Sequence, residues 1–331
     1  MGFPILNLPL VSFREFLKML EFKDLISLSL CSQQSRAQTK QNLYKLKDWE
    51  ICAVVNWFPG ITFRKGDMEE HVLGVFLYED FVNRPNWRSR IQFCQGFHVA
   101  MNEDGYLSSF WLNNAIGMYG VWKYVTELFQ KDVELIYYNN CTTWAMYLPL
   151  LFPQRTVPKT HFQNDGKQSL QIVSFLKVME ECSSEHLKIS GCHFRDIDFV
   201  RFGNYRTFET PVGLWITVSH LTRMKCSKIS IGFSEWKHSD ANEFLRHWIY
   251  NRDMPNLEWL NIGFSCGGDV REEAILEGLE EFITRTGNKR RFQKYNEDFT
   301  FNGLEIRNKC GVVASVQVVV GSNRLRMAVW Q

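Results

Sequence analysis

The sequence predicts a mixed α/β protein: a short helical N-terminal segment, then a larger repeat-like α/β domain that ends in antiparallel strands. Three observations support this prediction. Apolar residues recur at helical spacing within the first 45 residues. Strand-like and helical segments alternate over about residues 130–265, after a mixed β region that begins near residue 46. Residues 291–331 contain apolar and polar residues in alternation, which is typical of antiparallel strands.

The composition is that of an ordinary folded protein. Of 331 residues, 45% are apolar and 22% are charged, and the formal net charge is +2. This small charge gives no reason to expect nucleic acid or a membrane as a partner. The nine Cys are odd in number and irregularly spaced, which does not indicate a disulfide framework. We therefore expect an intracellular location, in the cytoplasm or nucleus.

The first predicted helix follows a Leu-Pro pair. Pro9 disfavours helix at Leu8, and Ser12 with Glu15 has the spacing of a capping box. Apolar residues then recur at i, i+3, i+4 and i+7. They are Phe13, Phe16, Leu17 and Leu20. The pattern predicts an amphipathic helix that begins near residue 12.

A second short helix is predicted from about Lys23, and a polar, basic segment follows it from residue 32 to residue 40. Its apolar residues are Leu25, Ile26, Leu28 and Leu30. Two or three such helices cannot bury this many large side chains among themselves, because a unit below about 40 residues rarely folds alone. The helices must pack on the rest of the chain or on a partner, and periodicity alone leaves both possibilities open.

The run LPLVSFREFLKMLEFKDLISLSLCSQQS resembles an F-box. The family pattern is a Leu-Pro pair, an apolar helix, an acidic-Pro step and a second helix with a Leu-rich face. Two positions depart from it. Glu21-Phe22 stands where the family has an acidic-Pro step, and Ser35 stands where it usually has Trp. The Leu-Pro pair and the Leu-rich face are intact.

This resemblance implies a helix-in-groove contact with a Skp-type adaptor and, through it, a cullin. The residues placed on the adaptor are Leu8, Pro9, Phe16, Leu17, Leu20, Leu25, Leu28 and Leu30. It also implies a non-catalytic substrate-receptor subunit of a ubiquitin ligase that binds an unidentified protein target. The alternative is a ligase-independent interaction protein in which the same helices are internal core.

A weak repeat runs through the central part of the chain and partly matches the leucine-rich repeat consensus. Its aligned central positions are Ile136, Thr160, Leu187, Ile229 and Leu260. Helical segments lie between them, which predicts parallel strands with helices on one side, in a solenoid or in an open sheet. Side chains between the inward positions point outward and are candidates for binding the target. They are Lys188, Ser190, Ser230, Gly232 and Asn261.

The segment KISIGFSEWKHSDANEFLRHWIYNRDMPNLEWLNIGF resembles the F-box-associated domain that follows F-boxes in one large family. Its most specific part is N-x-F-L-x-x-W. This part comprises Asn242, Phe244, Leu245 and Trp248. The resemblances divide the chain into an F-box over residues 1–45 and an F-box-associated domain over residues 46–331.

Motifs for catalysis, phosphate binding and metal binding are missing from the sequence. Gly267-Gly268 lacks the spacing and the Lys-Ser/Thr of a phosphate loop. One Cys and His cluster has no spacing typical of zinc sites. It comprises Cys182, His186, Cys192 and His193. We therefore expect no catalytic residues, no metal and no cofactor. The basic run GNKRRFQK is interpreted as a solvated loop.

Overall fold

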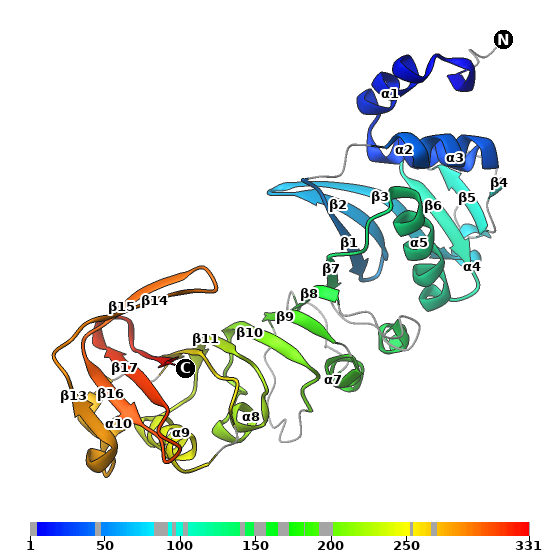
Figure 1. The fold of residues 1–331 in the computed structure, drawn as a ribbon. Coiled ribbons are helices and arrows are strands. Elements are labelled where there is room, and N and C mark those ends of the chain that lie inside the picture. Colours follow the sequence, from blue (N-terminus) through cyan, green and yellow to red (C-terminus); the bar gives the residue numbers. More distant parts are fainter. Residues whose placement is uncertain are drawn as a thin grey trace. The chain divides into compact units, whose positions relative to one another are not determined.

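The computed structural model divides the chain into two compact units (Figure 1). Unit 1 comprises Met1–His161 and Ser169–Glu181, and unit 2 comprises Phe162–Gln168 and Cys182–Gln331. The described residues are 5–43, 48–82, 92–94, 97–101, 105–139, 143–148, 157–164, 172–181, 183–191, 201–251, 254–265 and 270–330. The predicted division after residue 45 falls inside unit 1 and stays a prediction.

Unit 1 begins with short helices. They are η1 (Ile5–Asn7), α1 (Leu10–Met19), α2 (Phe22–Leu30) and α3 (Gln33–Asn42). The predicted capping box at Ser12 is wrong, because α1 begins at Leu10. Pro9 is the N-cap, and its carbonyl accepts a hydrogen bond from the Phe13 N–H at 2.9 Å. The extended backbone at Pro9 separates η1 from α1, which starts directly after it.

A mixed sheet follows these helices in unit 1, as predicted for this region. Its strands are β1 (Glu50–Val55), β2 (Gly60–Lys65), β3 (Met68–Leu77), β4 (Gln92–Cys94), β5 (Phe97–Met101), β6 (Leu107–Trp111) and β7 (Leu135–Asn139). Their order is β7-β1-β2-β3-β6-β5-β4. Only the β1–β7 and β3–β6 pairs among these strands are parallel. The first five residues of β8 (Val157–Gln163) also belong to unit 1.

The helices of unit 1 outside the N-terminal segment are α4 (Tyr78–Val82), α5 (Asn114–Phe129), η2 (Thr143–Tyr147) and α7 (Ile172–Glu181). The longest, α5, has the helical apolar pattern VWKYVTELF in its sequence. Its N-cap is Asn113, whose side chain accepts hydrogen bonds from the N–H groups of Ala115 and Ile116. Most of one face of α5 is buried against the sheet.

Unit 2 is an open α/β sheet. Its strands are β9 (Ser184–Ser190), β10 (Tyr205–Val212), β11 (Lys228–Ser234), β12 (Trp259–Phe264), β13 (Ile283–Arg285), β16 (Leu304–Arg307), β17 (Val313–Val319) and β18 (Arg324–Trp330). The order is β13-β16-β17-β18-β12-β11-β10-β9, in which β9 to β12 are parallel and the other pairs antiparallel. The predicted antiparallel C-terminal strands are thus confirmed.

The remaining elements of unit 2 are α8 (Val218–Arg223), α9 (His238–Tyr250), α10 (Glu272–Leu276), η3 (Glu280–Phe282), η4 (Val320–Ser322), β14 (Arg290–Lys294) and β15 (Glu297–Phe301). Helices α8 and α9 lie on one side of the sheet, and the β14–β15 hairpin lies on the other (Figure 1). Helix α10 ends at Leu276, although the helical sequence pattern EEAILEGLEEFIT continues to residue 284. Gly278 has a φ of +68°, which ends the helical path and leaves residues 283–285 to form β13.

The repeat register is confirmed in unit 2, and one strand was missed. Leu187, Ile229 and Leu260 all lie in parallel strands and share one row of the sheet with Phe208. Phe208 belongs to β10, which fills the long interval between Leu187 and Ile229. That interval is 42 residues, against 31 between Ile229 and Leu260, and its greater length was the signal in the sequence for an additional strand.

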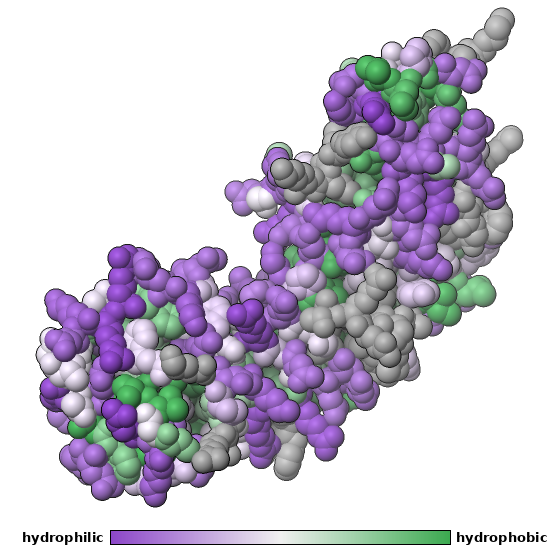
Figure 2. Space-filling view, in the orientation of Figure 1, coloured by the Kyte–Doolittle hydropathy of each residue, from purple (hydrophilic) through white to green (hydrophobic). Residues whose placement is uncertain are grey.

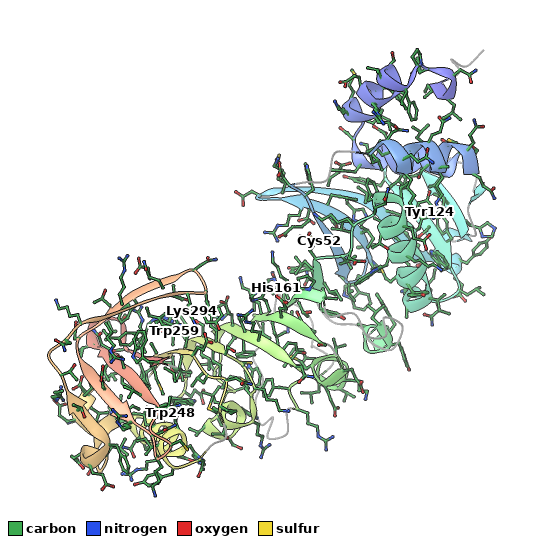
Figure 3. All side chains as sticks on the ribbon, viewed as in Figure 1. Cys52, Tyr124, His161, Trp248, Trp259 and Lys294 are labelled. Carbon is green, nitrogen blue, oxygen red and sulfur yellow. The ribbon has the colours of Figure 1, made fainter. Side chains whose placement is uncertain are left out.

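The basic run that the sequence analysis interpreted as a loop is instead part of a β-hairpin. Tyr295 and Asn296 connect β14 to β15 with φ values of 57° and 59°, as a two-residue type I′ turn requires. The hairpin is anchored on Trp259, which stacks on Phe292 with ring centroids 4.7 Å apart and contacts Phe301 edge-on at 6.1 Å (Figure 3). These three aromatic residues are buried.

A buried lysine adds a polar attachment for the same hairpin. Lys228 Nζ lies 2.7 Å from Glu209 Oε1 of β10 and 3.1 Å from Glu297 Oε1 of β15. Burial would lower the pKa of Lys228, but hydrogen bonds and attraction to the two carboxylates outweigh burial and raise it. The charged form of Lys228 is therefore the one that holds the hairpin.

We expect Phe292→Ala to detach the hairpin from the sheet. Removal of a buried Phe side chain costs about 3–5 kcal/mol, and the loss falls on a two-stranded element that is not stable alone. Limited trypsin digestion should then cut faster after Arg290, Arg291 and Lys294. Phe233→Ala, at an exposed Phe of β11, is the control. Equal cleavage in wild type and the Phe292 variant would contradict this account of the anchor.

Candidate functional site

Helix α1 presents an exposed apolar surface. Leu10, Val11 and Met19 are 54%, 72% and 83% exposed, and Figure 2 shows hydrophobic side chains gathered over this helix. We define the α1 surface by Leu8, Pro9, Leu10, Val11, Phe16, Met19 and Leu20, all of them exposed or partly exposed. A cluster of exposed large apolar side chains on one short helix is typical of a protein-binding site.

The opposite side of α1 is attached to the rest of the helical segment. Phe13 and Leu17 are buried, and Arg14 Nε donates a hydrogen bond of 2.9 Å to Asn42 Oδ1 of α3. The helix is therefore held from one side while its other side remains available for a partner.

Helix α2 is fixed to the sheet of unit 1 by an aromatic cluster. Phe22 stacks on Phe63 of β2 with ring centroids 4.2 Å apart and an interplanar angle of 7°. Trp49 and Phe129 contact the Phe22 ring edge-on at 4.9 and 6.0 Å. Phe22, which stands where the F-box pattern has Pro, is thus the residue that attaches α2 to the sheet.

Polar contacts hold α2 and α3 in place. Ser29 Oγ lies 2.6 Å from the hydroxyl of Tyr124 in α5, which is labelled in Figure 3. The Arg36 guanidinium lies 4.7 Å above the Tyr124 ring and pairs with Glu127 at 2.9 Å. Ser35, the other departure from the pattern, is buried and donates a hydrogen bond to the Leu28 carbonyl. A small hydroxyl residue therefore fits the close contact between α2 and α3.

The structure separates the eight predicted adaptor contacts into two groups. Leu8, Pro9, Phe16, Leu20 and Leu28 are partly or fully exposed. Leu17, Leu25 and Leu30 are buried within unit 1, so the structure does not place them on a surface. Their role here is to hold the helices together. Leu10 and Val11 were not selected from the sequence because they precede the predicted start of the helix near residue 12. Met19 was not selected because it lies outside the apolar i, i+3, i+4, i+7 pattern.

The open face of the unit 2 sheet is a second candidate site. Lys188, Glu209, Ser230, Asn261 and Arg326 lie in one row across β9, β10, β11, β12 and β18. We name this row the polar row. It lies on the side of the sheet that bears the hairpin, because Arg326 also lies over the ring of Phe299 in β15, at 4.1 Å. The row can offer a partner positively charged, negatively charged and uncharged polar side chains.

The predicted target-binding residues have unequal access to solvent. Lys188 is exposed, and Ser190, Ser230 and Gly232 are partly exposed. Asn261 is only 7% exposed, and Arg324 donates a hydrogen bond of 3.4 Å to its Oδ1. Asn261 is therefore a structural member of the sheet and not an accessible contact. Glu209 was not predicted from the sequence, because its strand β10 was not predicted.

Comparison with protein families identifies both regions. A family model for the F-box domain matches residues 5–46, and a model described as F-box associated matches residues 193–262. The chain contains an F-box domain followed by an F-box-associated domain. Its F-box comprises the helices α1, α2 and α3, and the described part of its F-box-associated domain comprises β10, β11, most of β12 and the helices between them. Neither the curated proteins nor the solved structures contain a significant match to it.

Two further properties bear on the site. Within the described ranges, no group of three or more His, Cys, Asp or Glu side chains is arranged to hold a metal ion. Of the suggested zinc cluster, Cys182, Cys192 and His193 lie outside the described residues. No helix in the described part of this F-box protein is long and apolar enough to cross a membrane.

We expect Phe22→Ala to destabilise unit 1 by about 3–5 kcal/mol, because the substitution leaves a cavity among three aromatic rings. Urea unfolding measures the change. Phe58→Ala, at a residue that is mostly exposed in the same unit, should cost far less. Similar losses for the two variants would show that Phe22 is not the anchor of α2.

A carboxylate beside α2 makes a pH-dependent contribution to the free energy of unfolding. Glu70 accepts a hydrogen bond from the Lys23 N–H at 3.1 Å. Burial raises the pKa of Glu70, and the backbone hydrogen bonds from Lys23 and Phe22 only partly oppose this. Because the pKa is higher in the folded state, ionisation of Glu70 costs stability, and the free energy of unfolding falls as pH rises from the ordinary value of 4.5 through the raised pKa.

We therefore expect Glu70→Gln, which retains an acceptor, to be more stable than wild type at neutral pH. The difference should disappear below about pH 4, where the wild-type carboxyl is protonated in both states. Urea unfolding at neutral pH and below about pH 4 measures the difference in the free energy of unfolding between the two proteins. A difference that is the same at both values would contradict the proposed cost of ionisation.

Proposed function

We propose that this F-box protein is the substrate-receptor subunit of a Skp–cullin–F-box ubiquitin ligase. The observation that carries the proposal is the α1 surface, an exposed apolar face within the region that matches the F-box. The F-box family binds Skp-type adaptors, and a helix that lays its apolar face into a groove is a common mode of peptide recognition.

The α1 surface is suited to such a contact on energetic grounds. Complete burial of one large aliphatic side chain contributes about 1.5–3 kcal/mol. Leu10, Val11 and Met19 are mostly exposed in the free chain, so a partner would recover most of this free energy on binding. Because the buried side of α1 is already packed, the helix loses little conformational freedom on association.

The second part of the proposal concerns the protein target. We propose that it binds to the open face of unit 2, where Lys188, Ser190, Ser230 and Gly232 are accessible. The F-box protein would then act by proximity: it holds the target near the ubiquitin-loaded enzyme and raises the effective concentration of the target lysine. The bond-making chemistry belongs to other subunits, so this chain needs no catalytic residue.

The alternative is an interaction protein that works outside any ligase. The burial of Leu17, Leu25 and Leu30 within unit 1 favours it, because these residues form core as the alternative requires. It does not account for the apolar residues that α1 leaves exposed.

Co-purification with Skp-type adaptors tests the proposal. Leu10→Ser/Val11→Ser changes two exposed positions and should leave the fold intact, since surface substitutions alter stability by about 0.5 kcal/mol or less. We expect adaptor capture to fall about tenfold or more, because each lost anchor costs at least about 1.4 kcal/mol.

Val173→Ser is the matched control, because Val173 is 76% exposed on α7 and equally apolar. It should be captured like wild type. If wild type captures none of the adaptors tested, the ligase assignment fails and the interaction-protein alternative stands. If the double variant is captured as well as wild type, adaptor binding does not use the α1 surface.

A further inference from the structure

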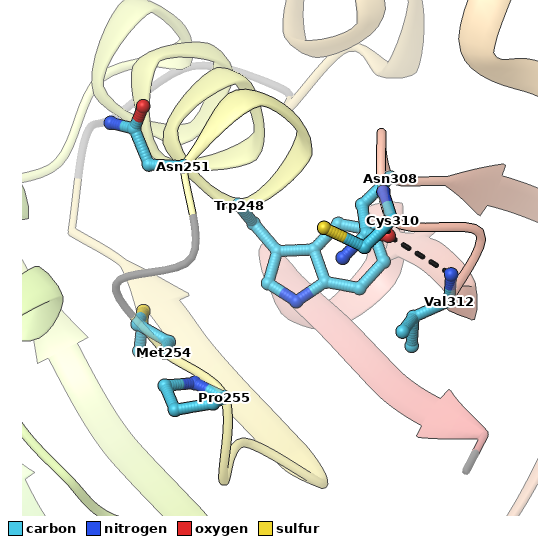
Figure 4. A pocket seen from close by; sticks show the side chains of 7 residues that line it. All are labelled: Trp248, Asn251, Met254, Pro255, Asn308, Cys310 and Val312. Atoms are coloured by element: carbon cyan, nitrogen blue, oxygen red, sulfur yellow. Dashed lines mark hydrogen bonds between the residues drawn. The ribbon is translucent and has the colours of Figure 1, made fainter.

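A small pocket lies within unit 2, beside the C-terminal end of α9 (Figure 4). Its volume is about 210 Å³. Trp248, Met254, Pro255 and Val312 form its apolar walls, and Asn251, Asn308 and Cys310 complete its lining. The walls come from α9, from the turn before β12, and from the loop between β16 and β17. Neither the adaptor contact nor the polar row uses these residues.

The loop that closes the pocket is held in a fixed shape. Asn308 Oδ1 accepts hydrogen bonds from the N–H groups of Cys310 at 3.0 Å and Val312 at 2.9 Å. The Lys309 N–H donates to the Ile249 carbonyl of α9 at 3.0 Å, which ties the loop to the helix. Trp248 is buried and forms a rigid wall. The pocket is therefore formed before any ligand arrives, and binding does not require it to be ordered.

The size of the pocket limits what can occupy it. Pockets for drug-sized ligands and cofactors have volumes of about 300–1,000 Å³, which is larger than this one. A space of about 210 Å³ with walls of Trp, Met, Pro and Val suits a single large apolar side chain. A charged side chain is disfavoured, because the described residues of the lining include no charged group to pair with it and burial of an unpaired charge is costly.

The polar part of the lining complements a peptide backbone. The Asn251 amide nitrogen lies 2.9 Å from His247 Nδ1, which leaves its carbonyl oxygen as an acceptor. Asn308 uses its carbonyl oxygen within the loop and keeps its NH₂ group as a donor. An acceptor and a donor beside an apolar pocket match the N–H and C=O groups that flank a side chain in a peptide.

We propose that this pocket binds one uncharged apolar side chain, of the size of Leu, Met or Phe, from a peptide segment of the protein target. The identity of the donor as the target rests on the proposed receptor function, whereas the pocket's preference for an apolar peptide residue does not. The pocket thus supplies an anchor for recognition, while the polar row supplies polar contacts.

Cys310 provides a direct test on the full-length chain. Cys310 is exposed, forms no disulfide and lies in the lining, while Cys31 is exposed and forms no disulfide at the end of α2 in unit 1. The rates of alkylation of both thiols by iodoacetamide are measured by peptide mass spectrometry. The probes are N-acetyl-leucinamide, N-acetyl-phenylalaninamide and, as the charged control, N-acetyl-aspartic acid amide.

We expect the Leu or Phe probe to slow the alkylation of Cys310 alone. At a probe concentration of about twice its Kd the rate falls about threefold, because only the unoccupied fraction reacts. The Asp probe should have no effect, and Cys31 should react at the same rate throughout. Val312→Trp fills the pocket and should abolish protection, while Val320→Trp, at an exposed position of η4, should retain it.

Absence of protection by both apolar probes, or equal protection by the Asp probe, would overturn the inference. If the Val312 variant does not fold, the comparison of the three probes on wild type still decides it. Adaptor capture of the same preparations separates the two proposals. Protection without capture supports the pocket and rejects the ligase assignment, and capture without protection does the reverse.

Discussion

The stacking of Phe22 on Phe63 is the contact on which the arrangement of the F-box in unit 1 depends. It attaches the first turn of α2 to the sheet, and the rest of α2 follows with Leu25 and Ile26 fully buried. Because α2 is buried in this way, α3 packs on α2. Helix α1 then lies on the outside of the helical segment. The apolar residues of the F-box are thus divided between internal core and an exposed helix, and both uses occur in the same 40-residue segment.

This division explains why the two departures from the F-box pattern are compatible with a folded segment. A Pro at position 22 would suit the start of a helix, but it would have no aromatic ring to stack on Phe63. A Trp at position 35 would need space that the contact between Ser35 and Leu28 does not leave. Each departure is therefore matched to a neighbour within unit 1, and the part of the F-box that remains exposed keeps its apolar character.

In unit 2, one face of the open sheet is covered and the other remains partly accessible. Helices cover the apolar side, where Leu187, Phe208, Ile229 and Leu260 form a continuous row. On the other side the hairpin covers only the region around Trp259 and Lys228 and leaves the outer part of the polar row in solvent. The hairpin thus forms a local core with Trp259. It also covers part of the sheet face and so restricts the area that a partner can reach.

The sequence predicted the fold well where periodicity and burial coincide. Helix α5, the parallel strands at Leu187, Ile229 and Leu260, and the C-terminal strands all carry continuous apolar patterns. The pattern failed at β10, where Arg206 and Glu209 interrupt the apolar residues, and in the hairpin, whose basic side chains hide the buried Phe292. It also failed at α1, because the predicted helix began near residue 12, after the exposed Leu10 and Val11, and because the exposed Met19 lies outside the apolar pattern.

The pocket and the α1 surface lay beyond sequence reasoning for a common reason. Exposure is a property of what the rest of the chain leaves uncovered, and no local pattern encodes it. Trp248 belongs to a motif that the sequence did mark, yet its role as a pocket wall depends on a loop sixty residues later, fixed by Asn308. A buried Trp in a helix is an ordinary core residue unless a neighbouring segment leaves part of its side chain uncovered, in which case it can line a pocket. Both proposed binding surfaces therefore arise where the chain covers its own cores incompletely, in unit 1 at α1 and in unit 2 beside α9.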